Sequence, residues 1–397
     1  MNIVISHPTR QHSDKLAIAL NAANMLGHYL TLLPDRRALD FIPTYLDRYL
    51  PNTVFRNSLE PIPVSRIKTF LGPLLIQRIT YNSQRKSVKD LGEYISWTLF
   101  DQWVARKIKI LSPDLVVGYE MCCVETFREA ERLGIPRILD AAACHYRYVD
   151  KTLPEWLSGK QGLSGKLLRH RKEEEISLAS QIICVSEFSA KSYTEYGVDN
   201  KKIIVNPLGC DLRLFNCATL LKESIGINLI YIGQQSYHKG FDTLITAFDN
   251  LLRSHSDATL TVIGPVGDFA GKNYSESIIF KGMISHSEMV AELGHSDCLI
   301  LPSRCESFGL VVIEALAAGT PVIVSNRAGA SMAVEEGLNG WTFNPDIWTD
   351  LLELILKFCD NIKENRMKGA DCRNSVNNWS WDKYRDRSIA IFKEFSK

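Results

Sequence analysis

Two series of short apolar runs, separated by segments of helical length, constrain the fold of this 397-residue chain more than any other feature. Nearly continuous apolar strands that alternate with helices are typical of parallel sheets covered by helices on both faces. Two such series predict an α/β protein with two doubly wound, Rossmann-like domains. The first series lies at residues 2–7, 113–120, 137–143, 181–187 and 202–209, and the second at 228–233, 259–264, 277–282, 298–303 and 321–326.

The spacing of the two series predicts the domain boundaries. We expect a first domain over residues 1–208 and a second over 209–378, with a hinge in the stretch 209–228 between the two series. Residues 379–397 read as a terminal helix that packs back on the first domain. The side chains that would dock this helix are Trp379, Trp381, Tyr384 and Phe392. Parallel sheets bind ligands at the carboxyl ends of their strands, so a site is expected in the cleft between the domains.

The distribution of apolar residues and cysteines indicates a cytoplasmic protein. No window approaches the ~18 apolar residues of a transmembrane helix, and the N-terminus already reads as a strand, not as a secretion signal. The ten cysteines form no CxxC pair, which disfavours a structural zinc site and a disulfide framework. Reduced, buried thiols are the expectation, and no metal or resident cofactor is predicted.

The charge is unevenly distributed along the chain. Residues 1–208 carry 28 Lys and Arg against 22 Asp and Glu, and the remainder carries 18 against 23. The excess gathers in residues 48–109, with 11 basic and 4 acidic side chains, and residues 65–86 read as an amphipathic stretch. This segment is either a solvated basic face around a core helix, or a contact for an anionic membrane or acceptor. No basic-aromatic module points to nucleic acid.

The most informative segment is residues 301–326, which read as strand, turn, helix, Gly-Thr-Pro stop and strand. The predicted helix from Leu310 to Ala318 is apolar nearly all round and should be buried. Glu314 is the lone charge within it. Because a buried carboxylate is costly without hydrogen-bond donors, Glu314 needs a partner. That partner is either a ribose diol or a structural Arg or Lys.

The turn before this helix has the features of an anion site. Ser307, Phe308, Gly309 and Leu310 offer backbone N–H groups at a helix N-terminus, and glycine lets a ligand approach the backbone closely. Glu306 precedes them by one residue and adds a carboxylate for sugar hydroxyls. The segment therefore predicts one binding site for both an anionic and a hydroxylated group.

This segment resembles the signature of the family 4 retaining glycosyltransferases, which have the GT-B fold. The matching pattern is P-S-x-x-E-S-F-G-L-x-x-x-E-A-x-x-x-G-x-P-V, with two glutamates separated by seven residues. The resemblance implies that Glu306 and the backbone near Phe308 and Gly309 face the donor sugar and diphosphate. It implies that Glu314 binds the ribose.

A second element, residues 231–248, resembles the Gly-Arg…Lys-Gly element of the same family. It contains Gly233 and Gln234, and it places Lys239 on the donor diphosphate. Gln234 stands where the family carries arginine, so a positive charge is missing unless another arginine replaces it. The candidate replacements are Arg10, Arg304 and Arg327.

The resemblance also implies a residue for the sugar, and position along the chain suggests residues for the base and the acceptor. His145 lies where the family carries a cleft histidine, and with Lys239 and Glu306 it completes the predicted catalytic set, although an isolated histidine is usually structural. The backbone at Met283 is expected near the base. Three residues after the first strand are acceptor-side candidates, with an ordinary polar loop as the alternative: His7, Arg10 and His12.

The resemblance implies a retaining, metal-independent hexosyltransferase. Such an enzyme would move a sugar from a nucleotide-diphosphate sugar to a hydroxyl of a glycan, a lipid-linked or a small-molecule acceptor. The alternatives are a non-catalytic nucleotide-sugar-binding module and a nucleotide-sugar epimerase of the same fold. A dehydrogenase is disfavoured because no GxGxxG follows any strand.

Overall fold

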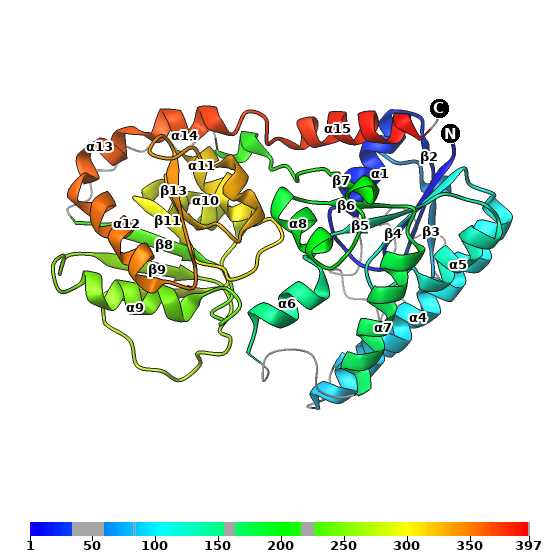
Figure 1. Ribbon diagram of the computed structural model, residues 1–397, viewed down its shortest axis with the longest axis horizontal. Helices are drawn as coiled ribbons and strands as arrows, with labels where there is room; N and C mark the ends of the chain where they lie inside the picture. Colours follow the sequence, from blue (N-terminus) through cyan, green and yellow to red (C-terminus); the bar gives the residue numbers. More distant parts are fainter. Residues whose placement is uncertain (34–58, 82, 84, 155–162, 216–225, 396–397) are drawn as a thin grey trace.

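The computed structural model describes residues 1–33, 59–81, 83, 85–154, 163–215 and 226–395. It contains two parallel sheets, of seven and six strands, each flanked by helices (Figure 1). The two sheets belong to two Rossmann-like halves, and this confirms the α/β architecture predicted from the apolar runs. We call the half with the seven-stranded sheet the first domain and the other half the second domain.

The seven-stranded sheet has the order β3-β2-β1-β4-β5-β6-β7, and all its pairs are parallel. Its strands are β1 (Ile3–Ser6), β2 (Leu26–Thr31), β3 (Ile67–Thr69), β4 (Leu115–Tyr119), β5 (Arg137–Ala141), β6 (Gln181–Cys184) and β7 (Ile203–Val205). The helices of this half are α1 (Ser13–Ala22), α3 (Gly72–Tyr81), α4 (Lys86–Leu111), α5 (Val124–Arg132), α6 (Tyr146–Thr152), α7 (Leu163–Leu178) and α8 (Glu187–Glu195).

The six-stranded sheet has the order β10-β9-β8-β11-β12-β13, again with parallel pairs. Its strands are β8 (Asn228–Ile232), β9 (Thr259–Ile263), β10 (Ile278–Gly282), β11 (Cys298–Leu301), β12 (Val322–Ser325) and β13 (Gly340–Phe343). Its helices are α9 (Phe241–Leu251), α10 (His286–His295), α11 (Leu310–Ala318), α12 (Trp348–Asp360), α13 (Ile362–Met367) and α14 (Gly369–Ser375). Four short 3-10 helices complete the described structure: Val64–Arg66, Asn200–Lys202, Leu212–Phe215 and Gly329–Ala333.

The central strands are buried on both faces. All four residues of β1, β11 and β12 are buried, as are all five of β4. Helices cover both faces, so these strands need no polar side and read as continuous apolar runs. This burial explains why the central strands could be predicted from hydropathy.

The predicted helix at 310–318 is confirmed as α11, and glycines bound it on either side. Gly309 (φ +90°) and Gly319 (φ +83°) both adopt the left-handed conformation. A Cβ on Gly309 would lie 3.2 Å from the Cγ of Glu306, so a side chain there would crowd the predicted site as well as strain the backbone.

The stretch 65–86 was predicted as one amphipathic segment, and this is wrong in part. It begins in the 3-10 turn Val64–Arg66, continues as the strand β3 and becomes helical only at Gly72. Lys68 and Thr69 pair with Leu30 and Thr31 of β2, so backbone pairing overrides the helical pattern.

The C-terminal helix α15 (Trp381–Glu394) returns to the first domain, as predicted (Figure 1). It packs against α1, and Phe392 is part of the first-domain core. Asn206 donates from Nδ2 to the Ser388 hydroxyl at 2.9 Å, and Arg387 donates to the carbonyl of Pro207 at 2.7 Å.

Candidate functional site

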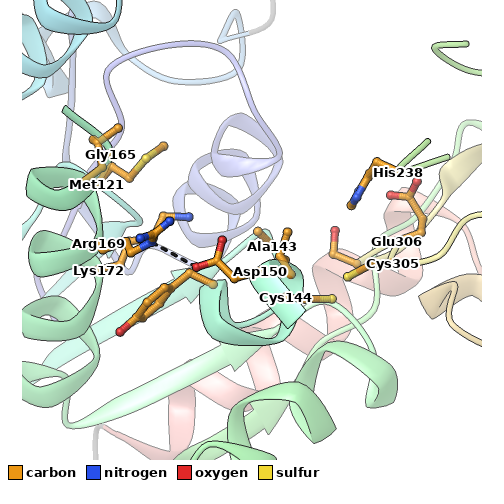
Figure 2. Close-up of a pocket in the computed structure, with 14 residues that line it drawn as sticks. Met121, Ala143, Cys144, Asp150, Gly165, Arg169, Lys172, His238, Cys305 and Glu306 are labelled. Carbon is orange, nitrogen blue, oxygen red and sulfur yellow. Dashed lines mark ion pairs between the residues drawn. The ribbon is translucent and has the colours of Figure 1, made fainter. Parts of the chain in front are cut away.

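A cavity of about 370 Å³ lies between the two domains (Figure 2). It is formed by loops that follow strands in both sheets, where ligands of parallel sheets are expected, and by α6 and α7 of the first domain. The first domain contributes Met121, Ala143, Cys144, Tyr146, Val149, Asp150, Gly165, Leu168, Arg169 and Lys172, and the second contributes His238, Cys305, Glu306 and Ser307. We call this space the interdomain cavity.

The two domains also touch directly beside this cavity. The Ser186 hydroxyl, at the start of α8, donates to the carbonyl of Ser307 at 2.6 Å. Gly329 packs at the same point, and a Cβ there would lie 2.1 Å from the Ser307 carbonyl. The loop that carries Glu306 and Ser307 is therefore held by both domains.

Lys239 and Glu306 form an ion pair at the edge of the cavity. Lys239 lies in the turn between β8 and α9, and Glu306 lies in the turn between β11 and α11. Gly240 fixes the first turn, because its φ is +68° and a Cβ there would lie 1.9 Å from the carbonyl of Pro302. The structure thus brings together two of the three residues predicted as catalytic.

The N-terminus of α11 lies directly after Glu306. None of the described residues accepts a hydrogen bond from the amide N–H of Gly309, Leu310 or Val311. Phe308 is buried at 2% exposure, and its carbonyl accepts from the amide of Ala330 at 2.6 Å. The backbone is thus fixed in place while its first amides stay available, which is the arrangement that binds phosphate at helix N-termini.

Glu314 contacts a histidine within the protein, in place of the structural arginine or lysine that was the predicted alternative to a ribose. Its Oε1 lies 3.3 Å from Nε2 of His286, at the start of α10. Burial raises the pKa of Glu314, and the contact with His286 opposes this shift. The His286 side chain is half exposed, so this pair forms at the surface of the second domain and not in its core.

The remaining donor-side candidates lie around the same loops. Gly233 follows β8, and the Gln234 side chain is exposed while its carbonyl accepts from the Tyr231 hydroxyl at 2.6 Å. Met283, after β10, is 76% exposed. Neither Gln234 nor Met283 lines the interdomain cavity.

Two of the arginines considered as replacements at the Gln234 position are held elsewhere. Arg304 is 9% exposed, makes a bidentate contact with Asp242 at 2.7 and 2.8 Å, and stacks on Tyr237. Arg327 pairs with Asp346. Of the cations considered, Lys239 is the one placed beside Glu306.

His145 is buried within a group of aromatic rings. Its ring stacks on Tyr146 and Tyr196, with centroid separations of 4.8 and 5.0 Å, and Nδ1 accepts from the amide of Arg147 as the N-cap of α6. Its sequence neighbours Cys144 and Tyr146 line the interdomain cavity, whereas its own ring does not. This position favours a structural role for His145 over contact with a sugar.

The burial of His145 predicts a pH-dependent stability. Burial, followed by the nearby Arg147, lowers the pKa of His145 to about 4. In the unfolded chain the pKa of this histidine has its ordinary value near 6.5, so between about pH 6.5 and pH 4 the unfolded chain binds more protons than the folded one. The contribution of the neutral His145 to the free energy of unfolding is therefore complete above about pH 6.5 and falls as the pH drops. Between pH 7 and pH 5 the wild type should lose about 2 kcal/mol more than His145→Asn, which keeps an N-cap acceptor.

Urea titrations at the two pH values measure this difference. Burial also lowers the pKa of His28 and His238, so His28→Asn and His238→Asn serve as comparison variants. Equal losses in the wild type and His145→Asn would show that His145 does not control the acid sensitivity.

Two of the three acceptor-side candidates line a second cavity of about 270 Å³. His7 and Arg10 line it, and Nδ1 of His7 lies 2.6 Å from the carbonyl of Thr9. His12 is not part of the lining and instead pairs with Asp140 at 2.9 Å. Residues that line both cavities place them side by side: Met121, Ala143 and Lys172.

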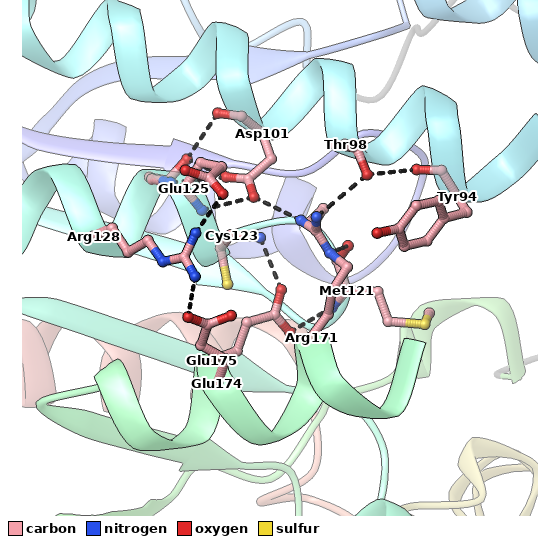
Figure 3. Close-up of polar contacts among 12 residues, drawn as sticks. Tyr94, Thr98, Asp101, Met121, Cys123, Glu125, Arg128, Arg171, Glu174 and Glu175 are labelled. Atoms are coloured by element: carbon pink, nitrogen blue, oxygen red, sulfur yellow. Dashed lines mark hydrogen bonds and ion pairs between the residues drawn. The ribbon is translucent and has the colours of Figure 1, made fainter. Parts of the chain in front are cut away.

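A buried charged cluster holds the loop after β4 that carries Met121 (Figure 3). Glu175 accepts from the amides of Met121 and Cys123 at 2.7 and 2.9 Å, and Arg171 donates to the carbonyl of Met121 at 3.1 Å. Arg171 also pairs with Asp101 at 2.6 Å. Met121 has φ +71°, a strained value for a non-glycine residue, so these contacts fix an unfavourable conformation at the cavity wall.

Sequence patterns did not reveal several cavity residues. His238 precedes Lys239 and was overlooked. Cys144 and Cys305 meet across the domain boundary, and their hydrogen bond, followed by burial, raises the pKa of Cys144. Lys172 was not predicted as a cavity residue either. It lies three residues after Arg169 in a Glu-rich helical segment, and this spacing indicates a charged helix face.

Comparison with known proteins agrees with this geometry. Residues 221–371 match the family described as glycosyl transferases group 1. A sucrose-phosphate synthase from Thermosynechococcus elongatus superposes with a TM-score of 0.67 at 18% identity, covering 99% of this chain and 98% of the other. An Anabaena HepE protein in complex with UDP gives 0.65 at 16% identity, covering 99% and 100%. The chain therefore has the GT-B fold, and its second domain is of the group 1 glycosyl transferase type.

The curated relatives are more similar in sequence but match over a shorter region. The glycogen synthase of Mycobacterium tuberculosis is 33% identical over 173 residues, which is 42% of each protein. The D-inositol 3-phosphate glycosyltransferase of Paenarthrobacter aurescens is 25% identical over 222 residues, 51% of this chain and 54% of the relative. The chain spans about half the length of these relatives.

Proposed function

We propose that this protein is a glycosyltransferase that takes a sugar from a nucleotide-diphosphate sugar. The observation that carries the proposal is the grouping of Lys239, Glu306 and the open amides of α11 at one edge of the interdomain cavity. A cation and oriented N–H groups suit a diphosphate, and a carboxylate suits sugar hydroxyls. The glycogen synthase and inositol phosphate glycosyltransferase relatives support the same reaction class.

In this proposal the donor displaces the contact between Lys239 and Glu306. Lys239 and the α11 amides then bind the diphosphate, and Glu306 accepts hydrogen bonds from the sugar. The bond between the anomeric carbon and the phosphate oxygen breaks, the acceptor oxygen bonds to that carbon, and the acceptor proton moves to the leaving phosphate. Preorganised positive charge at the leaving group is often the largest catalytic contribution, so the proposed reaction needs no metal.

Retention of the anomeric configuration is part of the proposal and rests on the family resemblance. With Lys239 and the amides on the diphosphate side, the acceptor hydroxyl approaches from that same face. The first domain supplies the acceptor site through the second cavity, where Arg10 and Lys172 are cationic. We infer a glycan, lipid-linked or small-molecule acceptor. The cavity also contains Glu120, which lies 4.0 Å from Lys172, so its lining carries both signs of charge.

A thermal-shift screen with UDP, GDP and ADP tests the donor class. One nucleotide should stabilise the protein, by about 2.7 kcal/mol at 100 times its Kd. Turnover of the matching nucleotide sugar then separates a transferase from the alternative of a non-catalytic binding module. Stabilisation by none of the three would contradict the proposal.

Glu314→Ala should weaken binding of that nucleotide by about 10-fold or more while the protein stays folded. The reason is that Glu314 is proposed to accept hydrogen bonds from both ribose hydroxyls, and hydrogen bonds to charged groups contribute about 1.5–3 kcal/mol. Isothermal titration calorimetry measures the change, and His286→Ala is the control because it removes the present partner of Glu314. Unchanged affinity in Glu314→Ala would assign Glu314 to the His286 contact alone.

The basic segment 48–109 is proposed to bind an anionic membrane surface. Residues 48–58 of this prediction lie outside the described residues. In α3 and α4, apolar side chains on the exposed faces include Ile79 at 76%, Leu91 at 49% and Ile95 at 38% exposure. The exposed basic residues around them are Arg78, Arg85, Lys89, Arg106 and Lys109. None of the described helices has the length and apolar character of a membrane crossing, so the contact would be peripheral.

Phosphatidylserine vesicles should sediment the protein at low salt and release it at ~0.5 M salt, because surface attraction of about 1 kcal/mol per basic residue is screened. The double variant Arg78→Glu and Lys89→Glu should sediment less. Lys363→Glu, an exposed position in the second domain, should behave as wild type. Absence of sedimentation at low salt would rule out the membrane contact and leave this segment as a solvated basic face.

A further inference from the structure

His238 occupies a distinctive position in the interdomain cavity. It lies in the turn between β8 and α9, directly before Lys239, and lines the cavity together with Cys305, Glu306 and Ser307 (Figure 2). In the proposed reaction this is the space between the diphosphate at Lys239 and the first-domain wall. The transferred sugar must occupy that space.

The backbone around His238 is firmly held. Its carbonyl accepts from the amide of Arg304 at 3.0 Å. Arg304 is itself fixed by Asp242 and also donates to the carbonyl of Tyr237 at 2.7 Å. The imidazole is therefore presented from a rigid turn, and rigid presentation is what a specific polar contact requires.

The imidazole lacks a hydrogen-bond partner that would explain its burial. Among the described residues nothing bonds to Nδ1 of His238, although this atom is buried. Buried polar atoms are nearly always paired, so the protein leaves this ring without the contacts that usually fix a buried imidazole. Nε2 also has no hydrogen bond among the described residues and is not one of the buried unpaired atoms, so it is the nitrogen left for a ligand in the cavity. Burial is the main cause that lowers the pKa of His238, and the charge of Lys239 lowers it further, whereas the charge of Glu306 acts in the opposite direction. The ring is thus neutral, with one donor and one acceptor nitrogen.

A neutral imidazole fits a hydroxyl better than it fits a phosphate. It can donate to a hydroxyl oxygen or accept from the hydroxyl proton, but it brings no charge to a diphosphate, which Lys239 is placed to bind. The ribose is expected farther away, at Glu314. The hydroxyls that remain close to His238 are those of the sugar held by Glu306.

We propose that His238 is a specificity-determining residue that hydrogen bonds a hydroxyl of the transferred sugar. This inference rests on the proposed function, because it assumes a nucleotide-sugar donor at Lys239 and Glu306. It predicts that His238 contributes to binding of the nucleotide sugar but not of the nucleotide diphosphate alone.

Calorimetry on the full chain tests this prediction. The first ligand titrated is whichever of UDP, GDP and ADP stabilises the wild type. The second is a nucleotide sugar that contains the same nucleotide, chosen from UDP-glucose, UDP-galactose, GDP-mannose and ADP-glucose. His238→Phe keeps an aromatic ring of similar volume but removes both nitrogens. It should raise the Kd of the nucleotide sugar about 5-fold to 10-fold, as expected for one lost hydrogen bond. Its Kd for the nucleotide diphosphate should stay within about 2-fold, since no hydrogen bond is lost there.

Two further variants complete the test. His238→Asn retains a donor and an acceptor close to the ring position and should restore part of the lost affinity, and it also provides a measurement if His238→Phe does not fold. His295→Phe replaces an exposed histidine at the end of α10 and should bind both ligands as wild type does.

The outcomes separate this inference from the proposed function. If His238→Phe weakens binding of the nucleotide and of the nucleotide sugar equally, His238 has a structural role and the inference is overturned. Unchanged binding of both ligands would also overturn it. A raised KM for the acceptor with unchanged nucleotide-sugar affinity would move His238 to the acceptor side and overturn the sugar contact. If no nucleotide binds the wild type, it is the proposed function that fails.

Discussion

Lys239→Ala is expected to lower kcat for sugar transfer by about 10²–10³-fold, with a much smaller change in KM for the donor. Lys239 is placed beside Glu306 at the cavity edge, where negative charge develops on the leaving diphosphate. An ammonium there stabilises the transition state more than the ground state, so its loss appears in kcat. Steady-state kinetics with the nucleotide sugar identified by binding provide the measurement.

Lys281→Ala is the matched control for Lys239→Ala. Lys281 pairs with Glu292 on the surface of the same domain, and its removal should leave kcat unchanged. A rise in KM with intact kcat in Lys239→Ala would mean that Lys239 binds substrate and transition state equally. That result would contradict its proposed role at the leaving group.

Arg171→Met is expected to destabilise the fold by about 3–5 kcal/mol, because it removes the cationic partner of the buried Asp101 carboxylate. Among the described residues, that carboxylate then keeps only its hydrogen bonds from Glu125 and Thr126. The Asp101 side chain is 0% exposed and accepts from Arg171 at 2.6 Å. The same substitution removes the bond to the carbonyl of Met121, so the strained loop loses one of its anchors. Urea unfolding followed by circular dichroism measures the loss.

Arg128→Met is the matched control, since Arg128 lies close to this cluster but is half exposed and pairs with Glu125 and Glu174 (Figure 3). Exposed ion pairs contribute about 0–1 kcal/mol, so this variant should be nearly as stable as wild type. Similar losses in the two variants would show that burial of Asp101 does not set the stability of this region.

The sequence predicted the central strands and α11, and it missed strands whose pattern is short or interrupted. The strand β2 contains Gly27 and His28, which break its apolar run. At the sheet edges, β3 has three residues and β13 has the sequence GWTF. The edge strands β7 and β10 were identified from their apolar runs, so it is the short length of β3 and the Gly and Thr within β13 that hide these two strands from hydropathy. Their positions follow from pairing with neighbours already in place.

The candidate site was predictable where its residues lie close in sequence. Glu306 and the turn at Gly309 form one local motif, and strand order brings Lys239 beside them. Contacts between distant segments were not predictable: Glu314 meets His286, 28 residues away, and the role of Glu175 under Met121 depends on the packing of α7. A histidine such as His145 has the same sequence appearance whether its ring enters a cavity or stacks between tyrosines, and only the fold separates the two cases.

The central claim is that one nucleotide diphosphate binds at Lys239, Glu306 and α11, and a crystal structure of the full chain with that nucleotide tests it most directly. The account predicts that the β-phosphate lies within hydrogen-bond distance of Lys239 and of the amides of Gly309 and Leu310, with the ribose hydroxyls on Glu314. A nucleotide bound elsewhere on the molecule, or a phosphate held without Lys239 and these amides, would contradict it.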